Sequence, residues 1–169
     1  MGANNFGEIA FLTSLCEPDY GYITNFGKAH LEGFIDIDGV IKAKTELYEW
    51  IIKNDKTLLI NGEDKNQKKF DNHKHIMFGC GENFQFNFRE KNNDFVNVLH
   101  DNYLFETKLY GTYNYSNVCA AIALGLEFGI DKNQINQSLK NYQPTMDIIW
   151  VNMVIGKNKP YLKTQQESR

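Results

Sequence analysis

A histidine and an acid follow an alternating apolar stretch in TNFGKAHLEGF, residues 24–34. His30 and Glu32 stand just past a predicted strand, and in open α/β sheets ligands bind beyond the carboxyl ends of the strands. A histidine with nearby oxygen donors can hold a divalent metal ion that neutralises phosphate charge. The alternative is an ordinary histidine in a surface loop, and the residue types alone leave both open.

Lys44 has an unusual place in the segment GVIKAKTELYEWIIK. It follows Val40 by four residues and precedes Leu47 by three, so it lies on the apolar stripe of a predicted helix. An amine in that place either extends to water along its aliphatic chain or has its pKa lowered by burial. In the second case the neutral amine is able to react, for instance with carbon dioxide to form a carbamate.

The segment GTYNYSNVCAA holds the third group of candidate residues. A glycine-containing loop carries Asn114 and Asn117 into the start of a predicted helix. Amide side chains and the free N–H groups of a helix start are suited to a polar ligand. The alternative is that Asn or Ser side chains only cap the helix.

Hydrophobic periodicity predicts the elements that position the first two candidates. Residues 5–15 favour a short helix that stops before Pro18, and residues 19–25 favour a strand. Residues 36–53 predict a helix with acids in its first turn, and residues 57–61 a short apolar strand. Strand, helix, strand is the βαβ pattern of a mostly parallel sheet flanked by helices, so the predicted fold class is α/β.

The second half of the chain has a different pattern. FQFNF places Phe84, Phe86 and Phe88 on one face, and FVNVLH and YLFETKLY also alternate. Three such runs predict a small antiparallel sheet with one face in solvent. Residues 115–129 then predict a helix that ends at a glycine suited to a left-handed cap, and Asp131 is expected to cap a further helix.

Composition excludes several classes of protein. The chain has 169 residues, 42% hydrophobic and 14% aromatic, which is typical of one globular domain. The net charge of -3 disfavours binding to nucleic acid. No apolar run reaches the roughly 20 residues of a membrane span, and the amino terminus is too polar for a signal peptide. A soluble, cytoplasmic protein is expected.

The three cysteines are odd in number and lack paired spacing. They are Cys16, Cys80 and Cys119. Buried thiols in a reducing compartment are therefore expected, and a disulfide framework or a zinc site is not.

Taken in order, these motifs resemble a known family. MGANNFGEIAFLTSLCEPDYGYITNFGKAHLEGF, GVIKAKTELY and GTYNYSNVCAAIALGLEFGI are similar to segments of the ATP-dependent Mur ligases. GANNFGEIAFLT followed by NFGKAHLEGF is most similar to the members that add D-alanyl-D-alanine to UDP-N-acetylmuramoyl-tripeptide. The resemblance runs from Met1 to about Thr145. Folylpolyglutamate and cyanophycin ligases share the architecture but match these motifs less well.

The resemblance implies roles for individual residues. His30 matches a histidine that helps to hold Mg²⁺, and Lys44 a lysine that becomes carbamylated and supports the same metal. Asn114 and Asn117 match asparagines near the adenine of ATP, and Tyr113 stands where a histidine is more usual. By the same likeness, Asn25 lines the phosphate and substrate side. The remaining candidate, Asn4, is expected to face the muramyl-peptide substrate.

The resemblance also implies a domain organisation. The family's phosphate loop ending in Gly-Lys-Thr and its metal-binding acid precede the motif that opens this chain, and a further domain follows the central one. Residues 1–145 are therefore expected to be part of a Mur ligase central, ATP-binding domain, cut at both ends. Residues 146–169, MDIIWVNMVIGKNKPYLKTQQESR, are expected to be a tail unlike the family.

The implied activity is ATP-dependent amide-bond formation in peptidoglycan precursor synthesis, with ATP and Mg²⁺ as cofactors. A carboxylate is phosphorylated and the amine of D-alanyl-D-alanine attacks the acyl phosphate. The expected partners are UDP-N-acetylmuramoyl-peptide and D-alanyl-D-alanine, bound with the help of domains outside this chain, and a monomer is expected. The chain alone is expected to be inactive, and the alternative is a catalytically inactive remnant or a nucleotide-binding module.

Overall fold

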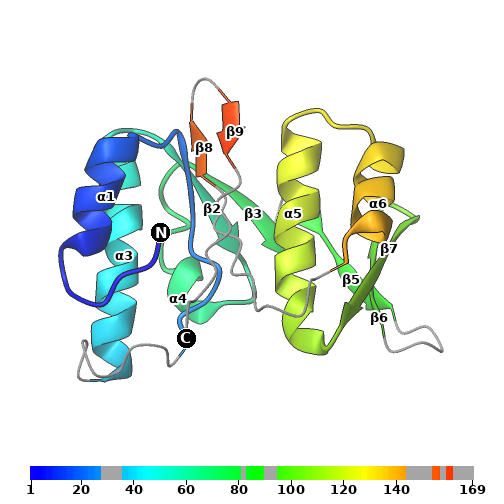
Figure 1. The fold of residues 1–169 in the computed structure, drawn as a ribbon, viewed down its shortest axis with the longest axis horizontal. Coiled ribbons are helices and arrows are strands. Elements are labelled where there is room, and N and C mark those ends of the chain that lie inside the picture. The colour runs from blue at the N-terminus through cyan, green and yellow to red at the C-terminus, as the bar shows by residue number, and fades with distance from the viewer. Residues whose placement is uncertain (28–35, 81–82, 90–94, 144–153, 157–158, 162–169) are drawn as a thin grey trace. The chain divides into compact units, whose positions relative to one another are not determined.

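The computed structural model describes residues 1–27, 36–80, 83–89 and 95–143, and the backbone of residues 154–156 and 159–161. A four-stranded sheet has the order β1(Tyr20–Tyr22)-β2(Thr57–Asn61)-β3(His75–Gly79)-β4(Phe84–Gln85), in which β1 pairs with β2 and β3 with β4 in parallel. A separate antiparallel sheet has the order β5(Asn87–Arg89)-β6(Phe95–His100)-β7(Tyr103–Tyr110) (Figure 1). The predicted α/β class, with a small antiparallel sheet, is confirmed.

The described elements fall into two compact units. The first holds α1(Glu8–Cys16), β1, α3(Ile37–Lys53), most of β2 and α4(Lys65–Lys68). The second holds Asn61–Glu63, β4 to β7, η1(Thr112–Asn114), α5(Tyr115–Glu127) and α6(Lys132–Asn141). A short antiparallel hairpin, β8(Val154–Gly156) with β9(Lys159–Tyr161), follows. The expected boundary at residue 145 lies outside the described residues and stays a prediction.

The βαβ prediction is confirmed by β1, α3 and β2. The side chain of Asp36 accepts a hydrogen bond from the N–H of Gly39 and so caps α3. The buried face of α3 includes Val40 and Ile51, at the spacing that the sequence predicts. β2 is buried along almost its whole length, as is typical of a parallel strand covered on both faces.

A polar network lies inside the first unit. The side chain of Gln67 is fully buried, and its Nε2 donates to the carbonyl of Ile23 at 2.8 Å and to Asp64 Oδ2 at 3.3 Å. The Tyr48 hydroxyl lies 2.8 Å from the carbonyl of Leu59 and 3.2 Å from Gln67 Oε1. The network thus connects α3 and α4 with the end of the β1 segment.

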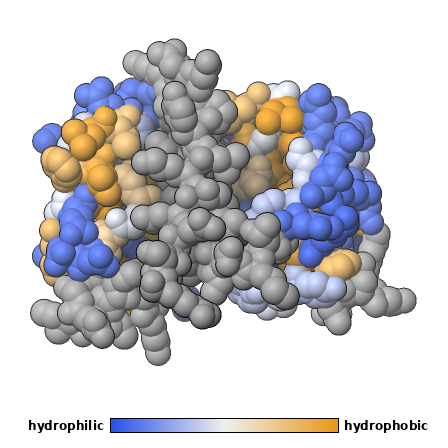
Figure 2. Space-filling view, viewed as in Figure 1, coloured by the Kyte–Doolittle hydropathy of each residue, from blue (hydrophilic) through white to orange (hydrophobic). Residues whose placement is uncertain are grey.

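The first helix differs from its prediction. Gly7 adopts a left-handed conformation, so α1 begins only at Glu8 and Phe6 lies outside it. Within α1, Ile9 is buried, whereas Ala10 is exposed. Figure 2 shows hydrophobic surface over α1, where Phe11 and Leu15 are exposed.

The run FQFNF does not form the single strand that its alternation predicts. Phe84 belongs to β4 and Phe88 to β5, in two different sheets, and Phe86 between them is buried. The N–H of Phe86 donates to the carbonyl of Gly79 at 3.1 Å, which holds this residue against β3. The chain therefore changes sheets within the run, a turn that alternation cannot indicate.

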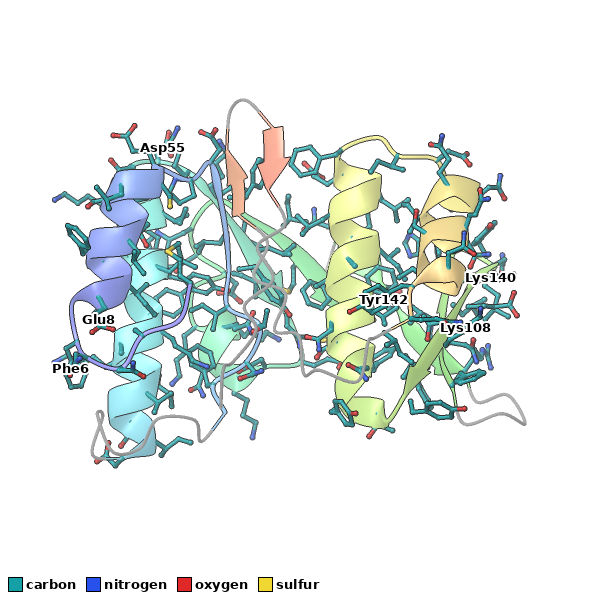
Figure 3. All side chains as sticks on the ribbon, in the orientation of Figure 1. Phe6, Glu8, Asp55, Lys108, Lys140 and Tyr142 are labelled. Carbon is teal, nitrogen blue, oxygen red and sulfur yellow. The ribbon has the colours of Figure 1, made fainter. Side chains whose placement is uncertain are left out.

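The other two alternating runs pair as predicted. In β7 the side chains of Phe105 and Thr107 are buried and Lys108 is exposed, which gives the sheet one face in solvent. α6 lies along β7, where Asn136 Oδ1 accepts from the N–H of Glu106 at 2.9 Å. Lys140 of α6, labelled in Figure 3, forms an ion pair with Glu106.

Both helix ends predicted in this unit are confirmed. Gly129 has a φ of 71° after α5, and the N–H of Ile130 donates back to the carbonyl of Gly125 at 2.9 Å. Asp131 caps α6 by accepting from the N–H of Asn133 at 2.8 Å.

The cysteines follow the expectation only in part. All three are free thiols, but Cys16 and Cys80 are exposed and only Cys119 is buried. Burial raises the pKa of the Cys119 thiol to about 12, so it stays protonated. Exposure of the other two follows from their places at the end of α1 and after β3.

Within the part of the chain that is described, no helix combines the length and apolar character needed to cross a membrane.

Candidate functional site

Lys44 and Asn25 are brought together in the first unit. Lys44 Nζ donates to the carbonyl oxygen of Asn25 at 2.7 Å and lies 3.4 Å from Asn25 Oδ1. Asn25 Oδ1 also accepts from the N–H of Gly27 at 3.0 Å, which closes a local turn. Two oxygens of one residue therefore face the lysine amine from the segment that follows β1.

The environment of Lys44 lowers the pKa of its amine. The side chain is half-buried between α3 and the Asn25 turn, and desolvation lowers the pKa of the amine. The amine donates a hydrogen bond to the main-chain carbonyl of Asn25, so it contacts the protein as well as solvent. The reactive role of Lys44 stays a prediction.

His30 lies outside the described residues, together with the rest of the KAHLE segment. Among the residues that are described, no group of three His, Cys, Asp or Glu side chains is arranged to hold a metal ion. The oxygens of Asn25 beside Lys44 are of the type that Mg²⁺ prefers. A carbamate on Lys44 would add two more oxygens, so the residues present fit such an ion.

Asn4 lies in the loop that leads into α1. Its side chain is exposed, and its main-chain N–H donates to Glu8 Oε2 at 2.8 Å. Glu8 Oε1 accepts from the side chain of Asn5 at 2.7 Å. The loop is thus closed on the first residue of α1, and the Asn4 side chain remains available to a ligand.

In the second unit the loop before α5 places an exposed aromatic ring against a glycine. Gly111 has a φ of 83°, and a Cβ there would lie 2.3 Å from the ring of Tyr113. The ring therefore lies against the glycine, and 76% of Tyr113 is exposed. Asn114 Nδ2 donates to the carbonyl of Tyr110 at 2.8 Å, which orients its side-chain oxygen.

The capping alternative for these asparagines is wrong for Asn114. It stands at the N-cap position of α5, but no side-chain hydrogen bond caps this helix. Asn117 lies in the first turn of α5 with its side chain exposed. The start of α5 thus offers first-turn N–H groups and two amide side chains beside an exposed aromatic ring, which suits a planar polar ligand such as a purine base.

Two side chains that sequence reasoning did not select also shape the first unit. Glu46 bonds to two main-chain N–H groups at the start of α1, and Gln67 bonds to the segment that leads to Asn25. Each contact spans 36 or more residues, so no local pattern could have indicated it.

Comparisons with known proteins identify the family. The chain belongs to the Mur ligase middle domain family, whose model matches residues 1–125. A curated relative, the UDP-N-acetylmuramoyl-tripeptide–D-alanyl-D-alanine ligase of Haemophilus influenzae, is 30% identical over 148 residues, which cover 83% of this chain and 32% of the relative. The chain thus spans about a third of the length of this relative.

Solved structures agree on the fold. The crystal structure of MurF from Acinetobacter baumannii matches with a TM-score of 0.74 at 24% identity, covering 96% of this chain and 37% of that one. MurF ligase from Thermotoga maritima, solved in complex with ADP, matches with a TM-score of 0.68 at 21% identity, covering 93% of this chain and 38% of that one. At these identities the likeness shows a shared architecture.

Proposed function

We propose that this chain is part of the central, nucleotide-binding domain of a ligase that joins D-alanyl-D-alanine to UDP-N-acetylmuramoyl-tripeptide with ATP. The observation that carries the proposal is the placement of Lys44, half-buried and bonded to the carbonyl of Asn25 just after the first parallel strand. Membership of the Mur ligase family supports it, as does the similarity to a curated ligase of that specificity. The bound ADP of one structural neighbour supports a nucleotide as ligand.

Lys44 and His30 are the residues that would hold Mg²⁺. The neutral amine of Lys44 attacks carbon dioxide, a C–N bond forms and one proton leaves to solvent, so the lysine ends in a negatively charged carbamate. Asn25 keeps that side chain at the end of the β1 segment through its carbonyl oxygen. Mg²⁺, when bound, neutralises charge on the phosphoryl group that is transferred.

The loop before α5 has a separate task in the proposal. Tyr113 offers an exposed ring on which a purine base stacks, and Asn114 and Asn117 offer amides to its polar edge. The internal hydrogen bond from Asn114 to Tyr110 fixes one of these amides before a ligand arrives. Such preorganisation lowers the entropy lost on binding.

A titration of the chain with ADP tests this assignment. Tyr113→Ala is expected to weaken ADP binding about tenfold, since stacking of a base on an aromatic ring contributes roughly 1–3 kcal/mol. Asn117→Ala is expected to weaken it about fivefold, because one hydrogen bond contributes about 1 kcal/mol. Isothermal titration calorimetry with ADP measures both.

Two exposed residues at the carboxyl end of α6 serve as matched controls. Tyr142→Ala and Asn141→Ala make the same chemical changes in the same unit, and both are expected to leave the affinity for ADP unchanged. An equal loss in the controls would move the nucleotide away from the α5 loop. A wild-type chain that does not bind ADP would contradict the proposal of a nucleotide-binding domain.

A further inference from the structure

The first helix has no cap from its own side chains. Its N-cap residue is Gly7, which has a φ of 84° and no side chain to accept a hydrogen bond. The first N–H groups of any helix lack partners within the helix and need an acceptor from elsewhere. The free N–H groups at the start of α1 therefore need an acceptor from another part of the chain.

Glu46 of α3 supplies that acceptor. Its Oε1 accepts from the N–H of Gly7 at 2.7 Å, and its Oε2 accepts from the N–H of Ala10 at 3.0 Å. Both carboxylate oxygens are used, and the charge lies at the positive end of the helix dipole. α1 and α3 lie side by side in Figure 1, and this bridge fixes the start of α1 at one place along α3.

Glu8 holds the other end of the same loop. It accepts from the main-chain N–H of Asn4 and from the side chain of Asn5, and these hydrogen bonds, the one from Asn5 foremost, lower the pKa of its carboxyl group. Figure 3 shows Glu8 beside Phe6 where the chain enters α1. The loop of residues 4–7 is thus held by two carboxylates, one local and one from α3.

We propose that Glu46 is a positioning residue for the UDP-muramyl-peptide substrate, because it fixes the loop that presents Asn4. This rests on the proposed function and on the role that the family resemblance implies for Asn4, which is to face that substrate. A cap from within α1 would stabilise the helix equally well but would leave the loop free to move with it. A cap from α3 fixes the loop relative to the helix that also carries Lys44, two residues earlier in the chain.

Hydrogen exchange of the full chain, followed by NMR, tests the bridge itself. Glu46→Gln keeps the shape of the side chain, but its amide NH₂ must face one of the two N–H donors. The amides of Gly7 and Ala10 are expected to exchange about tenfold faster, as the loss of one charge-assisted hydrogen bond implies. Glu49→Gln is the matched control, because Glu49 is an exposed acid three residues later on α3. It is expected to leave the exchange rates of these amides unchanged.

Binding separates positioning from a purely structural role. UDP-N-acetylmuramoyl-tripeptide is expected to bind Glu46→Gln about fivefold more weakly than wild type, the equivalent of about 1 kcal/mol. ADP affinity is expected to be unchanged, because the nucleotide is assigned to the loop before α5. Glu8→Gln, which loosens the loop without a change in α3, is expected to give the same split between the two ligands.

The outcomes decide the inference in either direction. Faster exchange at Gly7 and Ala10 with weaker binding of the tripeptide nucleotide alone supports it. Unchanged exchange, an equal loss of both affinities, or the same effects in Glu49→Gln would overturn it. If the wild-type chain binds ADP but not the tripeptide nucleotide, this chain does not form that subsite by itself and the inference fails. A wild-type chain that binds neither ligand contradicts the proposed function. In that case the bridge from Glu46 is refuted only if the exchange rates of Gly7 and Ala10 are unchanged in Glu46→Gln.

Discussion

In buffer equilibrated with ¹³C-bicarbonate, the wild-type chain is expected to show a carbamate carbon resonance, separate from that of the α-amine of Met1, that Lys44→Met lacks. The reason is the half-buried position of Lys44, where desolvation lowers the pKa of its amine and leaves more of it neutral near pH 7 than at an exposed lysine. Only the neutral amine reacts with carbon dioxide. Carbon-13 NMR of the two proteins measures the difference directly.

The pH dependence of the same carbamate signal is a second test of its assignment to Lys44. Because the pKa of Lys44 is lowered, its carbamate is expected to persist at a lower pH than that of any exposed lysine and to disappear as the amine becomes protonated. Lys53→Met, which removes an exposed lysine from the last turn of α3, is the control and should keep the signal. If Lys44→Met keeps every carbamate resonance of the wild type, the carbamate belongs to another group.

Replacing Gln67 is expected to cause a large loss in the free energy of unfolding. Gln67→Leu removes the amide that donates to the carbonyl of Ile23 and accepts from the Tyr48 hydroxyl, all in a fully buried place. A buried polar group left without its partner costs about 1–3 kcal/mol. We expect the free energy of unfolding to fall by about 2 kcal/mol or more, and the melting temperature by roughly 5 °C.

Urea unfolding followed by circular dichroism measures this change. Lys68→Leu, an exposed position on the same short helix, makes a similar substitution without touching the network and should stay within about 0.5 kcal/mol of wild type. Equal stability of Gln67→Leu and wild type would mean that the network contributes little to the fold. Tyr48→Phe tests the other member and is expected to have a smaller effect, since the Gln67 amide keeps its bond to Ile23.

Periodicity and turn chemistry were sufficient to predict several elements. α3, β2, the two ends around Gly129 and Asp131, and the pairing of β6 with β7 all follow from patterns within one segment. By contrast, β3 and α4 were not predicted. β3 has the run HIMFG, in which only Ile76, Met77 and Phe78 are large apolar residues, and three such residues do not separate a strand from a loop or a helix.

In the candidate site, too, the sequence predicts some features and only the structure shows others. The sequence alone determined that Lys44 is a polar residue on an apolar stripe, because helical spacing decides which residues share a face. The order of its motifs determined the family, which the comparisons confirm. Those motifs also selected the loop before α5 as a place for a polar ligand, a use that stays a prediction.

Only the tertiary structure decided what these side chains contact. The partner of Lys44 is the carbonyl of Asn25, 19 residues away, and the partners of Glu46 are N–H groups 36 and 39 residues away. Such contacts arise when apolar burial brings α1 and the end of the β1 segment against α3, and the polar groups at those edges then find acceptors and donors nearby. Periodicity reports which face is buried, but it carries no information on which distant group meets it.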